Sequence, residues 1–453
     1  MKLLLFISAM SLAAQDRPAA QVFDQWLAAF NSGDKASIEA FVKQYEPARL
    51  DKVGETLSFR RSTGGFTLVE TEKAEGAEFS AIVKESSGTV FARVKLRVTP
   101  AAPHTVERLT IEQIETPANQ KPKRLPIDQV AKAAAEFARS QQFAGAFLIA
   151  HKGSPSIVRA FGDADRENHK PNTFETRFRI GSMNKMITSI AALQLVEKGK
   201  LELDAPIGKV LTDYPNEAIA TKVTLRHLLT HTGGTGDIFG PDYAANRTKL
   251  RSVSDYVRLY GARAPQFEPG SSSSYSNFGF VLMGALIEKA SGMDYYDYVQ
   301  KNIYNPAGMK SSGSLPEGEF HDQVSKGYMQ KEASWVSNVD TLPWRGSPAG
   351  GGYATVGDLQ RFATALLDGK LLGKELLQQA TRNQGKNRRP YGFGFMVHSG
   401  ELTGFGHSGG APGMNGELQV FPEAGTILVV LSNLDPPAAT RVATFINQRL
   451  PIN

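Results

Sequence analysis

Hydrophobic and polar positions alternate with two different periods along the first 116 residues. Between residues 22 and 42 apolar side chains recur at helical spacing, and a turn at residues 31–34 separates two predicted helices. Later segments alternate with the period of two that is typical of strands with one buried face, at residues 66–70, 78–84, 89–98 and 106–115. We therefore expect a small α+β domain over residues 20–116, in which helices pack on a twisted antiparallel sheet.

The periodic pattern stops at residues 117–126, which are rich in proline and basic side chains. A segment with this composition, and without helical or strand periodicity, predicts a linker. We expect a second and larger domain over residues 127–453.

The larger region opens and closes with strand patterns and is mainly helical between them. Hairpins are predicted at residues 146–161 and 417–431, and a terminal helix at residues 438–449. Two central helices, at residues 183–198 and 278–290, end at glycines. The first and last strands can share one antiparallel sheet beside a mostly helical lobe, which predicts an α+β fold with a cleft between sheet and lobe.

The amino-acid composition limits which binding partners and which catalytic groups the protein can use. At 453 residues, of which 41% are hydrophobic, the chain is long enough for two cores. It contains no cysteine, which excludes a cysteine nucleophile, disulfide bonds and thiolate metal sites. The net charge of +6 is dispersed, and the densest basic runs, residues 121–124 and 386–389, are typical of a solvated linker and loop. We therefore expect no nucleic-acid partner.

The N-terminus has the pattern of a secretory signal peptide. Lys2 precedes an apolar run at residues 3–12, and the small residues Ala13 and Ala14 follow it. This run is too short to cross a bilayer, and no later segment reaches the ~18 uninterrupted apolar residues of a transmembrane helix. We expect residues 1–14 to be removed and the mature protein to be periplasmic or secreted, without stable membrane insertion.

Ser182 and Lys185 form the first candidate catalytic pair. Strand-like residues 178–180 are followed by Gly181, which permits a tight turn before the predicted helix. Because residues three apart project from the same face of a helix, the Lys185 amine can reach the Ser182 hydroxyl. An amine with a lowered pKa can take the serine proton, and a helix N-terminus favours the developing negative charge. Alone, this spacing is also typical of a solvated helix start.

Two further strings supply the remaining groups of a candidate site. Tyr275 and Asn277 lie two residues apart in a loop-like segment, so both side chains can face one pocket. Tyr275 as a phenolate can relay a proton, and Asn277 can donate to a substrate carbonyl. Further along, paired glycines let the backbone approach a ligand closely, so the Gly410 and Ser182 amides can form an oxyanion hole.

The three strings, in this order, resemble the motifs of the serine β-lactamase and penicillin-recognising family. They are Ser182-Met183-Asn184-Lys185, Tyr275-Ser276-Asn277 and His407-Ser408-Gly409-Gly410. The chain is more similar to the class C β-lactamases, D-aminopeptidases, D,D-carboxypeptidases and related esterases than to other members. The likeness extends from about Leu125 to the C-terminus.

The resemblance implies a fold and a set of roles. The implied fold is a β-lactamase-like antiparallel sheet flanked by helices, with a mostly helical lobe. The implied reaction requires no cofactor. Ser182 is the acylated nucleophile, Lys185 and Tyr275 share proton transfer, and His407 occupies a catalytic position that is lysine in many members. The resemblance further implies the substrate-binding residues Asn277, Ser408 and Gly409 and the oxyanion amides of Ser182 and Gly410.

Histidine at position 407 favours some members of this family over others. Lysine is a permanent cation that suits a substrate carboxylate, whereas histidine titrates near physiological pH and can act as a base. We therefore expect an exported hydrolase of the esterase or D-amino-acid peptidase type, acting on a small ester, amide or D-peptide. A β-lactamase, a D,D-carboxypeptidase and a penicillin-binding sensor without turnover remain alternatives.

The first domain has a fainter resemblance. Its opening, residues 26–34, and its order of elements resemble the cone-shaped fold of SnoaL-like and nuclear-transport-factor-like domains. Such domains often hold a small molecule or dimerise, but a compositional likeness does not transfer function.

His227 and His231 lie four residues apart, a spacing that can bind a metal on a helix. The glutamate of the H-E-x-x-H motif is missing, and two glycines follow at once. We interpret both histidines as packing or loop residues and expect no metal.

Overall fold

The computed structural model describes residues 17–319, 324–331, 334–385, 387 and 389–452. The predicted signal peptide, residues 1–14, lies outside the described residues. The chain divides into two compact units, Met1–Lys123 and Arg124–Asn453. Among the described residues, no helix has both the length and the apolar character needed to cross a bilayer.

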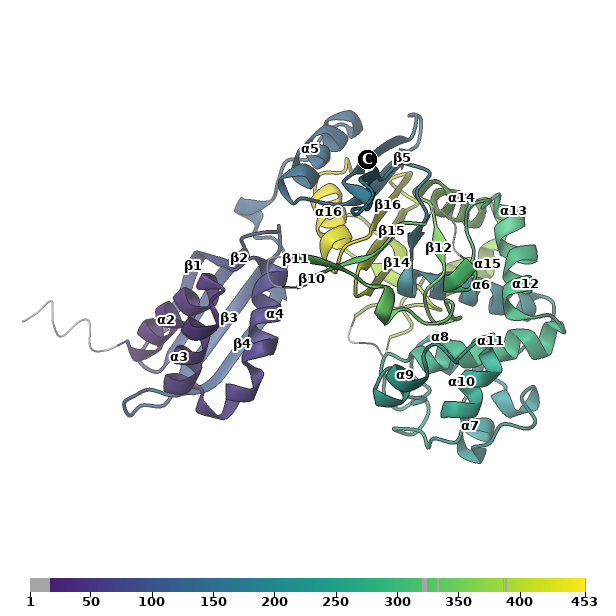
Figure 1. Cartoon of the computed structure of the whole chain (residues 1–453), viewed down its shortest axis with the longest axis horizontal. Coiled ribbons are helices and arrows are strands. Elements are labelled where there is room, and N and C mark those ends of the chain that lie inside the picture. Colours follow the sequence, from purple (N-terminus) through teal and green to yellow (C-terminus); the bar gives the residue numbers. More distant parts are fainter. Residues whose placement is uncertain (1–16, 320–323, 332–333, 386, 388, 453) are drawn as a thin grey trace, which may run out of the picture. The chain divides into compact units, whose positions relative to one another are not determined.

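In its described part, the first unit has three α-helices followed by a four-stranded antiparallel meander (Figure 1). Its elements are α2 (Pro18–Ser32), α3 (Lys35–Tyr45), α4 (Val53–Thr63), β1 (Phe66–Glu75), β2 (Glu78–Glu85), β3 (Phe91–Val98) and β4 (Val106–Ile114). Asp34 caps α3 by accepting from the Ser37 amide, and the rings of Trp26, Phe30 and Phe66 stack in the core. A largely apolar cavity of about 250 Å³ remains in this unit. The likeness to SnoaL-like domains stays a prediction.

A six-stranded antiparallel sheet with the order β13-β14-β15-β16-β5-β6 organises the second unit (Figure 1). Its strands are β5 (Gly145–His151), β6 (Ile157–Phe161), β13 (Met396–His398), β14 (Gly404–Ala411), β15 (Met414–Phe421) and β16 (Thr426–Ser432). β16 pairs with β5, with Val429 opposite Leu148, so strands from both ends of the unit lie side by side. The predicted α+β architecture is confirmed.

Helices pack on both faces of this sheet. Phe147 and Leu428 share a core with α5 (Ile127–Ser140) and α16 (Ala438–Asn447). The alternate residues of β5 and β16 enter the larger core of the helical lobe. The residues of β15 and β16 are buried along their whole length. β16 is apolar between Thr426 and Ser432, as expected for a strand covered on both faces, whereas β15 also buries polar side chains, at Asn415, Glu417 and Gln419.

The lobe is built from short helices and short strand pairs. Its helices are α6 (Asn184–Glu197), α7 (Glu217–Lys222), α8 (Leu225–Leu229), α9 (Pro241–Asn246), α10 (Val253–Tyr260), α11 (Asn277–Ser291), α12 (Tyr295–Val299), α13 (Asn305–Ala307), α14 (Val356–Leu367) and α15 (Lys374–Ala380). The short strands of the unit are β7 (Asp163–Asp165), β8 (Lys170–Pro171), β9 (Phe178–Arg179), β10 (Tyr328–Lys331), β11 (Ser334–Ser337) and β12 (Tyr353–Ala354). The helix predicted at residues 183–198 corresponds to α6 and the 3-10 turn before it.

The end of the segment predicted as a linker is fastened to the second unit. Arg124 donates to the carbonyl oxygens of Asn447 and Leu450, and the Leu125 amide donates to the Arg449 carbonyl at 2.9 Å. The composition of the segment gives no sign of these contacts, because Asn447 lies 323 positions from Arg124.

Candidate active site

Ser182 lies where a short strand pair meets the first helix of the lobe. β9 pairs with β12, and the chain then turns at Gly181 through a 3-10 turn into α6. Gly181 has a φ of +51°, and a Cβ at this residue would lie 3.1 Å from the Gly410 nitrogen. Glycine therefore permits both the turn and the close approach of β14 to the segment that carries Ser182.

Lys185 is fully buried, and its amine contacts three oxygen atoms. Nζ donates to Ser182 Oγ at 3.3 Å, to Asn277 Oδ1 at 2.7 Å and to the Ala349 carbonyl at 2.5 Å. Burial removes water from the ammonium and lowers the pKa of Lys185 to about 7, while the negative charge of Asp237 opposes this shift. A large fraction of Lys185 is therefore neutral at physiological pH.

Tyr275 borders the same amine from the segment that precedes α11. Its ring centroid lies 4.7 Å from Lys185 Nζ, and its hydroxyl is hydrogen-bonded to the Ser182 side chain. Although 46% of the residue is exposed, loss of water around the hydroxyl raises the pKa of Tyr275 to about 12. At neutral pH Tyr275 is thus a phenol, and not the phenolate expected from the sequence, because burial disfavours the anion.

Asn277 is held at both ends of its amide group. It is the first residue of α11, and the side chain of Ser276 caps that helix. Asn277 Oδ1 accepts from Lys185, while Nδ2 donates to Asp237 Oδ1 at 2.8 Å. The sequence assigns Asn277 to substrate binding, whereas these contacts place its amide between the lysine and an acidic residue.

His407 lies on β14 and is buried. Its Nδ1 is 2.5 Å from the Ser408 carbonyl, which can only accept, so Nδ1 carries the proton. Nε2 then accepts from the Tyr391 hydroxyl at 2.9 Å. Burial lowers the pKa of His407 to about 3, with a further contribution from the nearby charge of Lys185. The expectation that this histidine titrates near physiological pH therefore does not hold.

The rest of the third string brings backbone rather than side chains toward the nucleophile. A Cβ at Gly409 would lie 2.0 Å from the Ile180 carbonyl oxygen, so glycine is needed for this approach. Ser408 Oγ donates to the Met396 sulfur at 3.5 Å. The roles of Ser408 and Gly409 in substrate binding, and of the Gly410 amide in the oxyanion hole, stay predictions.

His231 and Tyr391 line the same site, although no motif assigned them to it. The His231 ring centroid lies 4.4 Å from that of Tyr275 and 4.9 Å from that of Tyr391. His231 Nδ1 accepts from the Ser276 amide at 3.1 Å, which leaves its proton on Nε2. His227 has a separate position, in the capping box of α8. His231 thus lies on the loop that borders the site, and His227 lies in the helix before it.

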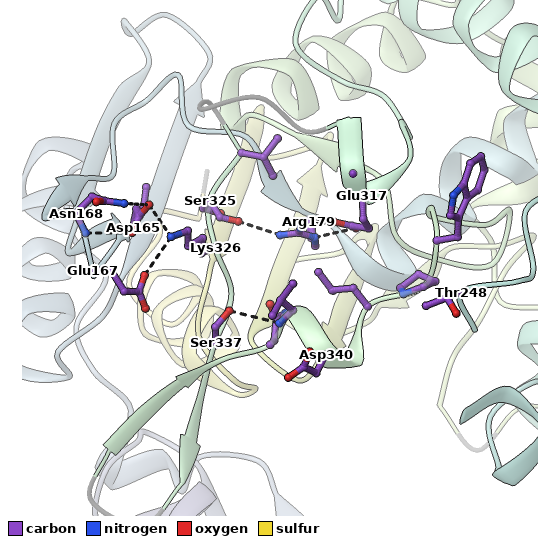
Figure 2. A pocket seen from close by; sticks show the side chains of 18 of the residues that line it. Asp165, Glu167, Asn168, Arg179, Thr248, Glu317, Ser325, Lys326, Ser337 and Asp340 are labelled. Atoms are coloured by element: carbon purple, nitrogen blue, oxygen red, sulfur yellow. Dashed lines mark hydrogen bonds and ion pairs between the residues drawn. The ribbon is translucent and has the colours of Figure 1, made fainter. Parts of the chain in front are cut away.

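A groove of about 930 Å³ lies beside the strand that precedes Ser182 (Figure 2). Arg179 of β9 pairs with Glu317 at 2.5 Å in the middle of this groove, and Lys326 pairs with Asp165 at 2.9 Å. Figure 2 shows Arg179 also directed at the backbone of Ser325, to which it donates. The two contacts of Arg179 anchor β9, and with it the turn that carries the predicted nucleophile.

Known proteins match this chain over most of its second unit. A family model described as Beta-lactamase matches residues 130–450. Penicillin-binding protein 4* of Bacillus subtilis (strain 168) is 29% identical over 316 residues, which are 64% of this chain and 68% of that protein. Esterase EstB of Burkholderia gladioli is 32% identical over 189 residues, which are 39% of this chain and 48% of the esterase.

Solved structures show the same fold. A penicillin binding protein from Bacillus halodurans superposes with a TM-score of 0.64 at 30% identity, covering 70% of this chain and 99% of the other. A D-amino acid amidase from Ochrobactrum anthropi SV3 superposes with a TM-score of 0.61, covering 71% and 96%, and at 23% identity this likeness concerns the fold alone.

Proposed function

This chain belongs to the beta-lactamase family of serine hydrolases, and from that premise we propose that it forms an acyl-enzyme on Ser182 and hydrolyses a small ester or amide. The observation that carries the proposal is the set of contacts around Lys185. The Asn277 and Ala349 oxygens can only accept, so a neutral amine donates its two protons to them. Its lone pair then points in the third direction, toward Ser182 Oγ. A base and a nucleophile are thus aligned in the resting site.

Acylation begins with transfer of the Ser182 proton to Lys185 Nζ while Oγ bonds to the substrate carbonyl carbon. The carbonyl oxygen gains the negative charge and is held by the amides of Ser182 and Gly410. When the tetrahedral intermediate collapses, the bond to the leaving group breaks. The Tyr275 phenol donates its proton to that group and regains one from the Lys185 ammonium, so the base is neutral again.

Deacylation repeats these steps with water in place of Ser182. The water gives one proton to the Lys185 and Tyr275 pair and attacks the acyl carbon. The bond to Ser182 Oγ breaks, the serine recovers its proton, and the acid product leaves. Ser182 is hydrogen-bonded to both Lys185 and Tyr275, so the proposed proton transfers use side chains gathered at the nucleophile, and no step calls on a cofactor.

The state of His407 favours esters and uncharged amides over substrates with a carboxylate beside the scissile bond. Because burial keeps the pKa of His407 at about 3, this position offers no cation to a carboxylate at neutral pH. Penicillins and peptides with a free C-terminal D-alanine carry such a carboxylate. We therefore place short-chain esters and amides of D-amino acids before β-lactams among the proposed substrates, and the esterase relative supports the first of these classes.

Parallel assays of one preparation test this proposal. Wild type is expected to hydrolyse p-nitrophenyl acetate or butyrate and to be labelled by a fluorophosphonate probe, whereas S182A is expected to lose both activities. D-alanyl peptides, D-amino acid amides and a chromogenic cephalosporin complete the substrate set. Inertness toward esters and amides together with rapid cephalosporin turnover would overturn the substrate order, and labelling of S182A would overturn the assignment of the nucleophile.

We further propose that the mature enzyme is exported after removal of residues 1–14. This proposal is supported by the sequence pattern of the N-terminus and by relatives from bacteria. N-terminal sequencing of protein from a periplasmic or culture fraction tests it, and an intact Met1 in cytoplasmic protein alone would contradict it.

A further inference from the structure

Asp237 lies on the loop that follows α8, and the backbone around it is held at three consecutive carbonyl groups. The Gly236 carbonyl accepts from Ser276 Oγ at 2.5 Å. The Asp237 carbonyl accepts from Arg263 at 2.8 Å, and the Ile238 carbonyl accepts from the Tyr260 hydroxyl at 3.0 Å. The side chain of Asp237 therefore projects from a fixed backbone.

The carboxylate of Asp237 determines which way the Asn277 amide faces. A carboxylate can only accept, so the NH₂ end of Asn277 must point to Asp237, and the two groups meet at 2.8 Å. The oxygen end of the same amide then points to Lys185 Nζ at 2.7 Å. The chain of contacts runs from a carboxylate, through one amide, to the base.

We propose that Asp237 is a positioning residue that directs the lone pair of Lys185 at Ser182 by locking the orientation of the Asn277 amide. The inference rests on the proposed function, because a direction for the lone pair matters only if Lys185 is the base. If the amide were reversed, its NH₂ group would face the amine and could donate to the lone pair. Lys185 would then have a proton, instead of a lone pair, directed at Ser182.

The charge of Asp237 has a second effect on the same amine. It stabilises the ammonium and so raises the pKa of Lys185 against the effect of burial. Other titratable groups around the amine are uncharged at neutral pH, because burial lowers the pKa of each histidine and raises that of each tyrosine. These groups are His231, His407, Tyr275 and Tyr391. Asp237 thus differs from them in carrying a full charge.

Substitution of the carboxylate by an amide separates this role from a merely structural one. In D237N the new side chain can donate as well as accept, so Asn277 is free to reverse. We expect kcat for p-nitrophenyl butyrate to fall by about 10- to 100-fold with little change in KM, a part of what general base catalysis supplies. The pH midpoint of the acidic limb of the kcat/KM profile is expected to be lower than in wild type, because the charge that raises the pKa of Lys185 is removed.

Two further variants provide controls. D237E keeps an anionic group that can only accept and is expected to retain more activity than D237N, with an acidic limb like that of wild type. D242N changes an exposed aspartate that pairs with Arg263, the same arginine that holds the Asp237 carbonyl, and is expected to leave kcat and the limb unchanged. The inference would be overturned if D237N and wild type had the same kcat and the same acidic limb in their pH profiles. It would also be overturned if D237E and D237N lost kcat to the same extent.

A measurement without turnover distinguishes failure of this inference from failure of the proposed function. NMR titration of protein labelled with ¹³Cε-lysine, with the Lys185 signal assigned through K185M, reports the pKa of the amine directly. A lower pKa in D237N than in wild type supports the inference whether or not esters are cleaved, and an unchanged pKa counts against it. Absence of both hydrolysis and fluorophosphonate labelling in wild type would contradict the proposed function instead.

Discussion

The Tyr391 hydroxyl donates to His407 Nε2 at 2.9 Å, and both side chains are buried. The hydrogen bond occupies the lone pair with which His407 would accept a proton. Together with a pKa of about 3, it makes His407 a neutral and already satisfied group in the resting site. This supports the proposal that Lys185, and not His407, accepts the proton of Ser182.

Removing this hydroxyl is expected to destabilise the protein. In Y391F the buried Nε2 of His407 loses its donor, and an unsatisfied buried polar group costs about 1–3 kcal/mol of unfolding free energy. Urea denaturation followed by circular dichroism measures the loss. Y243F is a matched control, because the Tyr243 ring packs on Phe239 and its hydroxyl has no hydrogen-bond partner among the described residues. Equal stabilities of the two variants would contradict the structural role of the pair.

The pH dependence of activity is expected to show one limb, on the acidic side. Lys185 must be neutral to accept the Ser182 proton, so kcat/KM should rise with pH through about 7 and level off above it. No basic limb from Tyr275 is expected up to pH 10, since the pKa of its phenol is about 12. Initial rates with p-nitrophenyl butyrate between pH 5 and 10, corrected for spontaneous hydrolysis, test both statements. A limb centred near pH 4 would instead indicate a carboxylate base.

A methyl group at position 409 is expected to disrupt the site. In G409A the new Cβ would meet the Ile180 carbonyl oxygen at 2.0 Å, so β14 must move away from the segment that carries Ser182. We expect at least a 100-fold loss of kcat, because a displacement of about 1 Å at a catalytic site has effects of that order. G318A serves as the control, since a Cβ at Gly318 meets no atom within 4 Å. Wild-type activity in G409A would show that this contact is not required.

Stability is expected to fall as pH rises from about 4.5 to about 7, owing to Glu417. This residue of β15 is buried beside Thr440, whose hydroxyl donates to it at 2.9 Å, and burial raises its pKa from the ordinary 4.5 to about 7. Because the folded state binds the proton more tightly than the unfolded state, the stabilising contribution is complete below pH 4.5 and is lost toward pH 7. A shift of this size corresponds to about 3 kcal/mol.

E417Q isolates this contribution. The neutral amide keeps an acceptor for Thr440 and does not ionise, so the difference in unfolding free energy between pH 5 and pH 8 should be smaller than in wild type by about that amount. Urea denaturation of both proteins at the two pH values measures it. The same pH dependence in E417Q and wild type would assign the effect to another group.

Local spacing was sufficient to predict the core of the site but not the state of its members. The three-residue interval of Ser182 and Lys185 on a helix predicts their contact, and the two-residue interval of Tyr275 and Asn277 places both at the same amine. Protonation depends on burial, which spacing does not reveal. For this reason the sequence suggested a phenolate at Tyr275 and a histidine that titrates near neutrality.

The residues that the sequence missed come from segments without a motif of their own. Asp237 lies six residues after His231 on the loop that follows α8, and this proximity is the one signal for it in the sequence. Tyr391 and Ala349 lie far along the chain from the groups they contact, and Lys185 meets Ala349 across 164 positions. The order of helices and strands was predictable because it depends on local periodicity, whereas these contacts arise from tertiary packing.

Lys185 donates a hydrogen bond to the backbone carbonyl oxygen of Ala349, so the acceptor does not depend on the side chain of residue 349. Exchange of residue 349 for another amino acid leaves that oxygen in place wherever the backbone path is kept. Scanning mutagenesis would therefore record position 349 as tolerant, even though its main chain holds one of the two protons of the neutral amine. A point mutation at residue 349 therefore need not remove the carbonyl oxygen that binds the proposed base. Sequence variability at this position would understate how much its backbone contributes to orienting Lys185.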